Sequence, residues 1–418
     1  MSVVGLITEY NPFHNGHLFH LNRAKEATGA QYALCIMSGN FVQRGEPAMV
    51  DKWARTRMAL AGGADLVIEL PVVYALQSAE GFALGGIRLL DALGVVDFVC
   101  FGSEAGDIEP LKEIADMLYH QPPRYRALLK GYLDRGLGFA DARQRAVADY
   151  FDGDSRCNPT QLLKTPNNIL AIEYIKALMM INSGIEPITI KRIGAGHDTD
   201  RLSGPISSAT AIRQFLRTGS DLDDTPVAIA LPDFTRDILR TEFDNAKGPV
   251  GLAAFDQLIL SMVRQSSPRR LSLLPDVKEG LENKLYRAAF RYGSLDQLLN
   301  KVKTRRYAYT RLQRILMNMM LGITAGQVDR FNRYGGPQYI RILGFNKKSL
   351  PLLKMIKARA RIPVITKAAH YRRLGGRNLA RMFEKDVRAT DIYSLAFDNR
   401  EYRIGGRDFT TGVIIMDG

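Results

Sequence analysis

Two histidines three residues apart, His14 and His17, stand between an apolar run and a helix-like segment. Val3–Ile7 predicts a buried strand and Leu18–Lys25 predicts a helix. A helix start attracts phosphate through its free N–H groups and the positive end of its dipole, and Gly16 lets the backbone approach a ligand without a Cβ in the way. Two imidazoles placed there can donate hydrogen bonds to the charge that develops when the bond between two phosphates is exchanged. The spacing therefore predicts adenylyl transfer, although such a pair can also hold a metal ion or lie at the surface.

A second candidate cluster lies nearly two hundred residues later, in the segment Ile206–Arg213. Hydroxyls and N–H groups at a helix start can bind phosphate oxygens, and an arginine one turn later adds a positive fork. By itself, the pattern of two serines and a threonine is typical of an ordinary helix cap. Combined with the first motif, it predicts a two-part triphosphate clamp whose catalytic residues are His14, His17, Ser207 and Arg213.

Strand-like and helix-like segments alternate over the first two hundred residues and must position both motifs. Further strands are predicted at Tyr32–Met37, Asp65–Leu70, Asp97–Phe101 and Glu186–Arg192, and helices at Lys52–Ala61, Ala79–Leu93, Ile108–Tyr150 (a long helical stretch) and Asn167–Ile181. This alternation predicts an α/β fold with a parallel sheet. Ligands of such sheets bind outside the carboxyl ends of the strands, which is where the two histidines stand.

The charge is unevenly distributed along the chain. The 418 residues carry a formal net charge of +14, yet Arg264–Arg388 alone holds 29 Lys and Arg against 7 Asp and Glu, a net charge of +22. The basic residues alternate with Tyr, Phe and Asn rather than lining one amphipathic helix, which favours a nucleic-acid partner over a membrane surface. The predicted RNA contacts are Lys52, Arg55, Arg269, Arg270, Arg305, Arg306, Lys347 and Lys348. Tyr307 and Tyr309 could stack on unpaired bases or pack within helices.

Composition excludes several classes of protein. Apolar runs are short and interrupted by charge, so no membrane span is expected, and the amino terminus lacks the pattern of a secretory leader. Cys35, Cys100 and Cys157 are far apart and odd in number, which fits a reducing cytoplasm, with the first two as core residues. No Cys/His cluster has zinc spacing, so no metal ligands are predicted.

The chain also resembles a known family. The segments Gly5–Leu18 and Ile206–Arg213 resemble the nucleotidyltransferase superfamily, whose Rossmann-like core is shared with class I aminoacyl-tRNA synthetases. Within that superfamily the chain is most similar to the bacterial tRNA(Met) cytidine acetate ligases. The similar segments are Ser38–Ala48, Gly63–Pro71, Phe101–Glu104, Thr165–Ala171 and Lys191–His197, and more loosely Leu343–Asn346 and Ile362–Thr366.

The resemblance implies a two-step reaction. Acetate attacks the α-phosphate of ATP to give acetyl-adenylate, and the acetyl group passes to N4 of the wobble cytidine of elongator tRNA(Met), forming N4-acetylcytidine. It also implies an ATP site made of Ile7, Thr8, Glu9, Tyr10, Asn11, Pro12, Phe13, His14, Asn15, Gly16, His17, Leu18, Phe19, His20, Gly102, Asn167 and Arg192. We expect Mg²⁺ to accompany ATP, as is usual in ATP chemistry, and no obligate protein partner.

Some of these residues have ordinary alternatives. Gly102 could be a strand-end turn and Arg192 a surface ion pair. One of Asn167 and Asn168 could be a helix N-cap, which favours Asn167 as the ligand residue. His197, with Asp198, could act as acid or base on the cytidine amine or serve only as a structural hydrogen-bond partner.

The polar, turn-rich stretch Asp221–Pro226 predicts a domain boundary. We expect a Rossmann-like parallel-sheet nucleotidyltransferase domain over 1–225, which binds ATP and is catalytic. A basic, mainly helical tRNA-binding domain with a small α/β C-terminal part should follow over 226–418, with strands at Ile340–Phe345 and Pro363–Thr366. Two other classes remain open: a small-molecule nucleotidyltransferase that adenylylates a metabolite, and a non-enzymatic RNA-binding protein.

Overall fold

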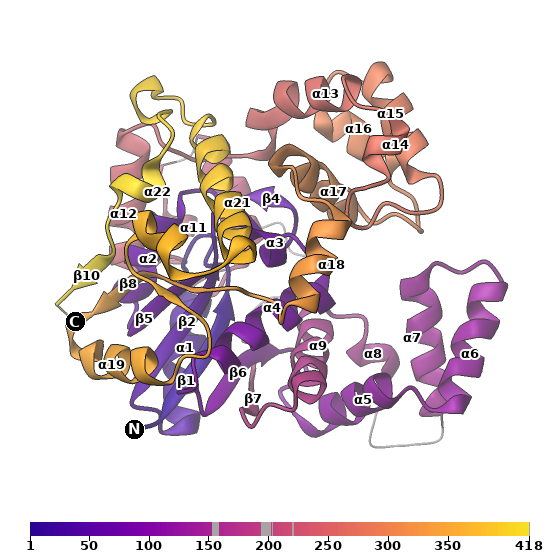
Figure 1. Ribbon diagram of the computed structural model, residues 1–418, viewed down its shortest axis with the longest axis horizontal. Helices are drawn as coiled ribbons and strands as arrows, with labels where there is room; N and C mark the ends of the chain where they lie inside the picture. The colour runs from indigo at the N-terminus through magenta and orange to yellow at the C-terminus, as the bar shows by residue number, and fades with distance from the viewer. Residues whose placement is uncertain (153–158, 194–201, 203, 220, 418) are drawn as a thin grey trace.

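A sheet of eight strands forms the centre of the molecule (Figure 1). The computed structural model describes residues 1–152, 159–193, 202, 204–219 and 221–417. The strand order is β10-β8-β5-β2-β1-β6-β7, and β9 pairs with β8. These strands are β1 (Val3–Thr8), β2 (Tyr32–Ser38), β5 (Leu66–Leu70), β6 (Phe98–Ser103), β7 (Glu186–Lys191), β8 (Ile340–Asn346), β9 (Val364–Ile365) and β10 (Ile414–Met416). A separate hairpin is formed by β3 (Phe41–Val42) and β4 (Glu46–Pro47).

Helices occupy most of the remaining chain. Those of the first part are α1 (Asn15–Thr28), α2 (Lys52–Ala61), α3 (Val72–Ala75), α4 (Ala79–Ala92), α5 (Glu109–His120), α6 (Pro123–Asp134), α7 (Phe139–Tyr150), α8 (Pro159–Leu162), α9 (Pro166–Ile181) and α10 (Ala209–Arg217). Those of the second part are α11 (Thr225–Ala228), α12 (Asp233–Asp244), α13 (Asp256–Arg264), α14 (Pro268–Leu271), α15 (Leu281–Arg291), α16 (Leu295–Val302), α17 (Tyr309–Leu321), α18 (Ala325–Arg333), α19 (Leu350–Arg359), α20 (Tyr371–Leu374), α21 (Arg377–Ser394) and α22 (Arg407–Thr410). Among the described residues, none of the helices has both the length and the apolar character that a membrane crossing requires.

Alternate side chains of the parallel strands enter two cores on opposite faces of the sheet. Val4, Cys35 and Val67 belong to the core beneath α1 and α2, whereas Val3 and Leu34 belong to the core beneath α4 and α9. This alternation follows from the two-residue period of a strand, and burial on both faces explains why the strands read as continuous apolar runs. The predicted α/β fold class is confirmed. Cys35 is buried, as predicted, and so is Cys100.

The C-terminal part of the chain returns to the central sheet. β8 pairs antiparallel with β5, placing Leu66 opposite Phe345, and β10 pairs parallel with β8. α12 packs against α2. The predicted boundary near residue 225 therefore does not separate two sheets. In Figure 1, α13–α17 form the group of helices at the upper right, and α6 and α7 project from the sheet at the lower right.

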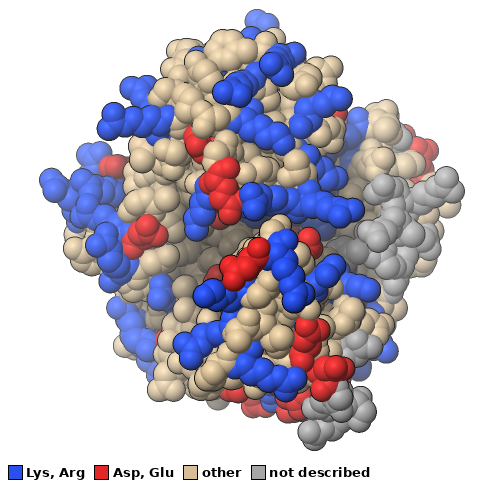
Figure 2. All heavy atoms as spheres, turned by 90° about the vertical axis from the view of Figure 1, so that its right-hand side faces the viewer, with Lys and Arg blue, Asp and Glu red and all other residues tan. Residues whose placement is uncertain are grey.

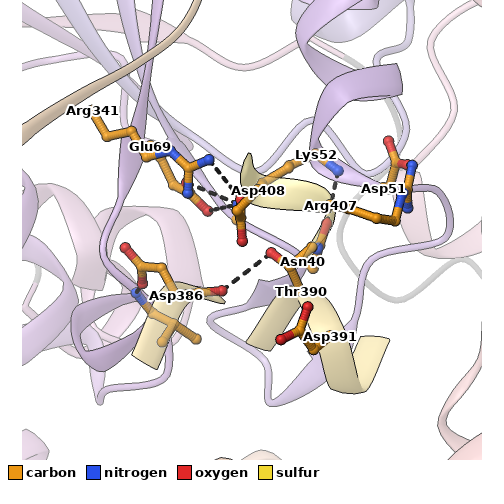
Figure 3. Close-up of polar contacts among 12 residues, drawn as sticks. Asn40, Asp51, Lys52, Glu69, Arg341, Asp386, Thr390, Asp391, Arg407 and Asp408 are labelled. Atoms are coloured by element: carbon orange, nitrogen blue, oxygen red, sulfur yellow. Dashed lines mark hydrogen bonds and ion pairs between the residues drawn. The ribbon is translucent and has the colours of Figure 1, made fainter. Parts of the chain in front are cut away.

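A buried ionic cluster fastens the returning segment to the first half of the chain (Figure 3). Lys52 Nζ lies 2.8 Å from Glu69 Oε1 and 2.7 Å from Asp408 Oδ1. Arg341 Nη1 lies 2.9 Å from Glu69 Oε2, and its Nη2 contacts Asp408 at 2.5 Å. Since the Lys52 side chain is 0% exposed, the prediction that it contacts RNA is wrong. Its ammonium group is neutralised by Glu69 and Asp408 inside the protein, because burying an unpaired charge would cost a large amount of folding free energy.

Arg55 is also 0% exposed, and its predicted RNA contact is wrong for the same reason. Its guanidinium donates to the backbone carbonyls of Val50 at 3.2 Å, Glu9 at 2.6 Å and Ser38 at 3.1 Å, and to that of Gly39. Arg55 thus ties the loop after β2 to the segment after β1. It supports the candidate site from inside the protein.

Candidate active site

His14 and His17 form a stacked pair at the carboxyl end of β1. The ring centroids are 3.8 Å apart with an interplanar angle of 27°. His14 is the N-cap of α1, and its Nδ1 accepts a hydrogen bond from the Gly16 N–H at 3.0 Å. The His14 N–H donates to Nδ1 of His17 at 3.3 Å. A neutral ring whose Nδ1 accepts must carry its proton on Nε2, so these bonds select the tautomer of both rings.

Both histidines are held in the neutral form. Burial, followed by the nearby charges of Arg192 and Arg213, lowers the pKa of His14 to about 3. Burial, followed by the repulsion that a second imidazolium would meet beside His14 and by the charge of Arg192, lowers the pKa of His17 well below its ordinary value. At neutral pH each ring can therefore donate one hydrogen bond from Nε2. The sequence left this protonation state open.

Aromatic packing holds the pair in place. Tyr10 meets Phe13 edge-on at 4.8 Å and meets His17 at 4.9 Å. The side chains of Tyr10 and Phe13 are 1% and 0% exposed, so they belong to the core beneath α1. Within the predicted ATP segment Ile7–His20, these two side chains position the histidines from behind.

The fold brings the second motif against the first. Asn15 Nδ2 donates to the carbonyls of Pro205 at 3.1 Å and Ile229 at 2.8 Å. Arg213 Nη1 donates to the carbonyl of Asn11 at 2.9 Å, and its Nη2 lies 3.0 Å from Glu46 Oε1. The two motifs therefore share one site, as the sequence predicted.

The serines of this motif have different roles. Ser208 is the N-cap of α10, and its Oγ accepts from the Ala211 N–H at 3.1 Å. Ser207 is 3% exposed, and its Oγ donates to the Gly204 carbonyl at 2.9 Å. The capping role that the sequence offered as an alternative belongs to Ser208. The ligand-binding role of Ser207 stays a prediction.

The remaining predicted ATP residues follow the neighbouring strands. Gly102 is the second-last residue of β6, and a Cβ there would lie 3.3 Å from Cγ of Arg192, which follows β7 directly. The N-cap of α9 is Thr165, so neither asparagine caps this helix, contrary to the prediction. Asn167 Nδ2 instead donates to Glu104 Oε1 at 2.6 Å. Thus Gly102, Asn167 and Arg192 come from adjacent strands and the helix beside them.

Asn168 organises the loop after β6. Its Oδ1 accepts from the N–H groups of Glu104 at 2.9 Å and Ala105 at 3.1 Å, and its side chain is buried. Asn168 is therefore structural, and the ligand-binding role of Asn167 stays a prediction. His197 and Asp198 lie outside the described residues.

Two carboxylates lie at the site: Glu9, which is one of the predicted ATP residues, and Glu46, which was not predicted individually. Glu46, on β4, pairs with Arg213. Glu9 Oε1 accepts from the Gln43 N–H at 2.8 Å, and burial raises the pKa of Glu9. The sequence offered no signal for Glu46 beyond its place in a similar segment, because a two-residue strand has no readable periodicity. In the part of the chain that the structure describes, no group of three or more His, Cys, Asp or Glu side chains could hold a metal ion.

The predicted RNA contacts fall in different places. Arg269 and Arg270, on α14, are exposed, as are Arg305 and Arg306 between α16 and α17. Tyr307 is 8% exposed and donates to the Glu279 carbonyl at 3.2 Å, so it packs and cannot stack on a base.

Lys347 and Lys348 lie at the other end of the sheet. Lys348 Nζ pairs with Asp65, just before β5, at 3.3 Å, and Lys347 pairs with Asp417 at 2.5 Å. Because β8 runs antiparallel to β5, its last residues reach the amino ends of the parallel strands, away from the histidines. The RNA contact at these two lysines stays a prediction, and it would require the RNA to reach both ends of the sheet.

Comparison with known proteins gives consistent results. The family model described as HIGH Nucleotidyl Transferase matches residues 1–408. The chain is similar to the tRNA(Met) cytidine acetate ligase of Acetivibrio thermocellus, with 45% identity over 417 residues and all of both chains covered. It is also 46% identical to the protein of the same name from Thermoanaerobacter sp. strain X514, with 98% of each covered.

Solved structures agree. The chain superposes on apo Thermotoga maritima TmcAL with a TM-score of 0.95 at 39% identity, and on the same protein bound with alpha-thio ATP with a TM-score of 0.93 at 38% identity, each over the full length of both chains. The predicted family resemblance is confirmed. This chain belongs to the HIGH nucleotidyl transferase family and, within it, to the tRNA(Met) cytidine acetate ligases.

Proposed function

We propose that this chain is an ATP-dependent ligase that activates acetate and acetylates N4 of the wobble cytidine of elongator tRNA(Met). The observation that carries the proposal is the neutral His14–His17 pair beside Arg192 and Arg213, in a chain similar over its full length to a ligase bound with an ATP analogue. We place the reaction in the cytoplasm and infer no obligate protein partner.

In the first step a carboxylate oxygen of acetate attacks the α-phosphorus of ATP. The bond from the α-phosphorus to the bridging oxygen breaks, and pyrophosphate leaves with the bonding electrons. His14 and His17 donate from Nε2 to the phosphate oxygens as negative charge grows on them. Arg213 and Arg192 supply positive charge without a proton that could be lost, since a guanidinium stays protonated. Ser207 and Asn167 would add neutral donors.

In the second step the N4 amine attacks the acetyl carbonyl carbon. The bond between that carbon and the phosphate oxygen of AMP breaks, AMP leaves with the bonding electrons, and N4 releases one proton to the solvent. Neutral histidines suit both steps because they donate without adding charge that would hold the nucleotide too tightly.

Mg²⁺ would enter the site on the triphosphate. The nearby carboxylates of Glu9 and Glu46 are engaged by the Gln43 N–H and by Arg213. Magnesium commonly binds through substrate phosphates and water with few protein ligands. The metal would neutralise phosphate charge.

The test is exchange of radiolabelled pyrophosphate into ATP with a panel of carboxylic acids. Exchange that depends on acetate, followed by acetylation of tRNA(Met) transcripts with a wobble cytidine, is the expected result. Acetate-independent nucleotidyl transfer to a phosphorylated metabolite would support the small-molecule alternative. RNA binding without any exchange would support a non-enzymatic protein.

A further inference from the structure

The helical group α13–α17 carries a concave basic site that no part of the proposed ATP chemistry uses. It has a volume of about 360 Å³ and is lined by nine residues, which include Lys284, Arg287, Arg291 and Lys301. Four of these nine residues are cationic, and none is acidic. In the upper part of Figure 2, where this group lies, the charged side chains are mainly Lys and Arg.

The four cations converge because of helix geometry. Lys284, Arg287 and Arg291 are spaced i, i+3 and i+7 on α15, so they share one face of the helix. Lys301, at the end of α16, faces them across the site. The three positions on α15 span about 10 Å along the helix axis, at 1.5 Å per residue. One phosphate is too small to contact all of them, whereas two or more consecutive phosphates of a chain can.

These charges are available to a ligand. Within the described residues, no ion pair to a carboxylate involves any of the four. Other arginines of the same helical group are paired, Arg306 with Glu279 at 3.2 Å and Arg314 with Asp276 at 3.9 Å. Like charges without a counter-charge repel one another, so this cluster does not stabilise the folded protein.

One of the cations is held in place by the protein. Lys284 is half-buried, and its Nζ donates to the Val302 carbonyl at 2.9 Å and lies 5.8 Å from the centre of the Tyr307 ring. Arg287, Arg291 and Lys301 are exposed. The site thus combines one charge that is held by the protein with three charges that are exposed to solvent.

The helical group is also joined directly to the nucleotide site. Arg314, on α17, lies against the β3–β4 hairpin, with its Nη1 at 3.5 Å from the Gln43 carbonyl. A Cβ added to Gly45 would lie 2.4 Å from the Arg314 backbone nitrogen, so the two backbones are in close contact. The same hairpin carries Glu46, the partner of Arg213. RNA held by α15 would therefore be held by a body packed on the catalytic machinery.

We propose that the site formed by Lys284, Arg287, Arg291 and Lys301 binds the phosphodiester backbone of the RNA substrate. This inference rests on the proposed function and adds to it the surface that holds the tRNA. Contacts to the backbone position an RNA without reading its sequence, so this site would supply affinity and orientation.

The test compares two exposed double variants of equal charge change. Arg287→Glu/Arg291→Glu removes two of the exposed cations, and Lys354→Glu/Lys357→Glu makes the same change on α19, near the amino ends of the parallel strands. Filter binding of tRNA(Met) over a salt series gives Kd and its salt dependence. We expect the α15 variant to bind roughly tenfold or more weakly and to lose about 1 to 2 units from the slope of log K against log salt. The α19 variant should stay near wild type.

The possible outcomes separate the two proposals. Acetate-dependent pyrophosphate exchange should be unchanged in the α15 variant, since the site does not touch ATP, and absence of exchange in the wild type would refute the proposed function itself. Normal exchange with unchanged tRNA affinity in the α15 variant would refute the phosphate site alone, as would equal weakening by the α19 variant. Loss of binding to phosphatidylglycerol vesicles, with tRNA binding intact, would assign the site to a membrane surface and overturn our proposal. The milder Arg287→Gln/Arg291→Gln variant should show an intermediate loss, which checks that misfolding is not the cause.

Discussion

Gly16 is the position where a single added methyl group tests the histidine geometry most directly. A Cβ there would lie 2.8 Å from Cε1 and 3.0 Å from Nδ1 of His14, whereas ordinary van der Waals contact begins at 3.4 Å. In Gly16→Ala the imidazole must therefore move by about 0.6 Å, the difference between 3.4 and 2.8 Å. The same movement disturbs the 3.0 Å hydrogen bond from the Gly16 N–H that orients the ring. A misplacement of about 1 Å can cost about 100-fold in rate, so we expect pyrophosphate exchange to fall by about 10- to 100-fold.

Stability should respond differently from activity. Gly16 is the second residue of α1, and alanine is favoured over glycine inside a helix by up to about 1 kcal/mol, which offsets the strain of the contact. Gly326 is a matched control because it is the second residue of α18 and nothing lies within 4 Å of a Cβ added there. The assay measures kcat for acetate-dependent exchange together with Tm. Wild-type exchange in Gly16→Ala, or an equal loss in Gly326→Ala, would refute the claim that the position of His14 limits the reaction.

Four further predictions follow from the charges of the site and of the core. Because burial lowers the pKa of His14 to about 3, the exchange rate measured from pH 8 to pH 5 should show no titration near 6.5, and a halving of the rate there would contradict neutral donors. The unfolded chain takes up this proton below about pH 6.5 and the folded chain does not, so the free energy of unfolding from urea titration should fall as the pH drops from about 6.5 towards 4. Lys52→Met removes the cation that pairs with the buried carboxylates of Glu69 and Asp408, and should lower the free energy of unfolding by about 3–5 kcal/mol. The surface variant Lys354→Met should leave the free energy of unfolding unchanged. Arg213→Lys keeps one positive charge but loses the planar fork, so exchange should fall roughly tenfold or more; an unchanged rate would show that charge alone suffices.

The predicted elements of the first two hundred residues agree closely with the structure. Lys52–Ala61 is a helix with the predicted bounds, and the strands predicted at Tyr32 and Glu186 begin at those residues. Such elements are readable because strand and helix periodicities are local, and because turn residues and caps mark their ends. The position of His14 and His17 after the first strand was enough to predict that they lie at the carboxyl edge of the sheet, since parallel strands present their carboxyl ends at one edge.

Other features depended on contacts between residues far apart in the sequence. The antiparallel addition of β8 beside β5 joins residues about 275 positions apart, and no local pattern specifies that pairing. The contact between Arg213 and Asn11 spans 202 positions. The roles of Ser207 and Ser208, and of Asn167 and Asn168, were also assigned only by their neighbours in space, because adjacent residues of one type are equivalent until the backbone orients them.

By itself, the sequence determined the α/β class, the place of the histidine pair at the end of the first strand and the excess of positive charge in the second half of the chain. These follow from residue types and their spacing. Only the tertiary structure decided which charges face a ligand. Lys52 and Arg55 are as basic in the sequence as Arg287 and Arg291, yet the first two are fully buried among carboxylates and carbonyls. The latter two line an open site without a counter-charge. The physical reason is that the solvation and pairing of a charged side chain depend on which distant segments fold against it. The amino-acid composition does not specify those segments.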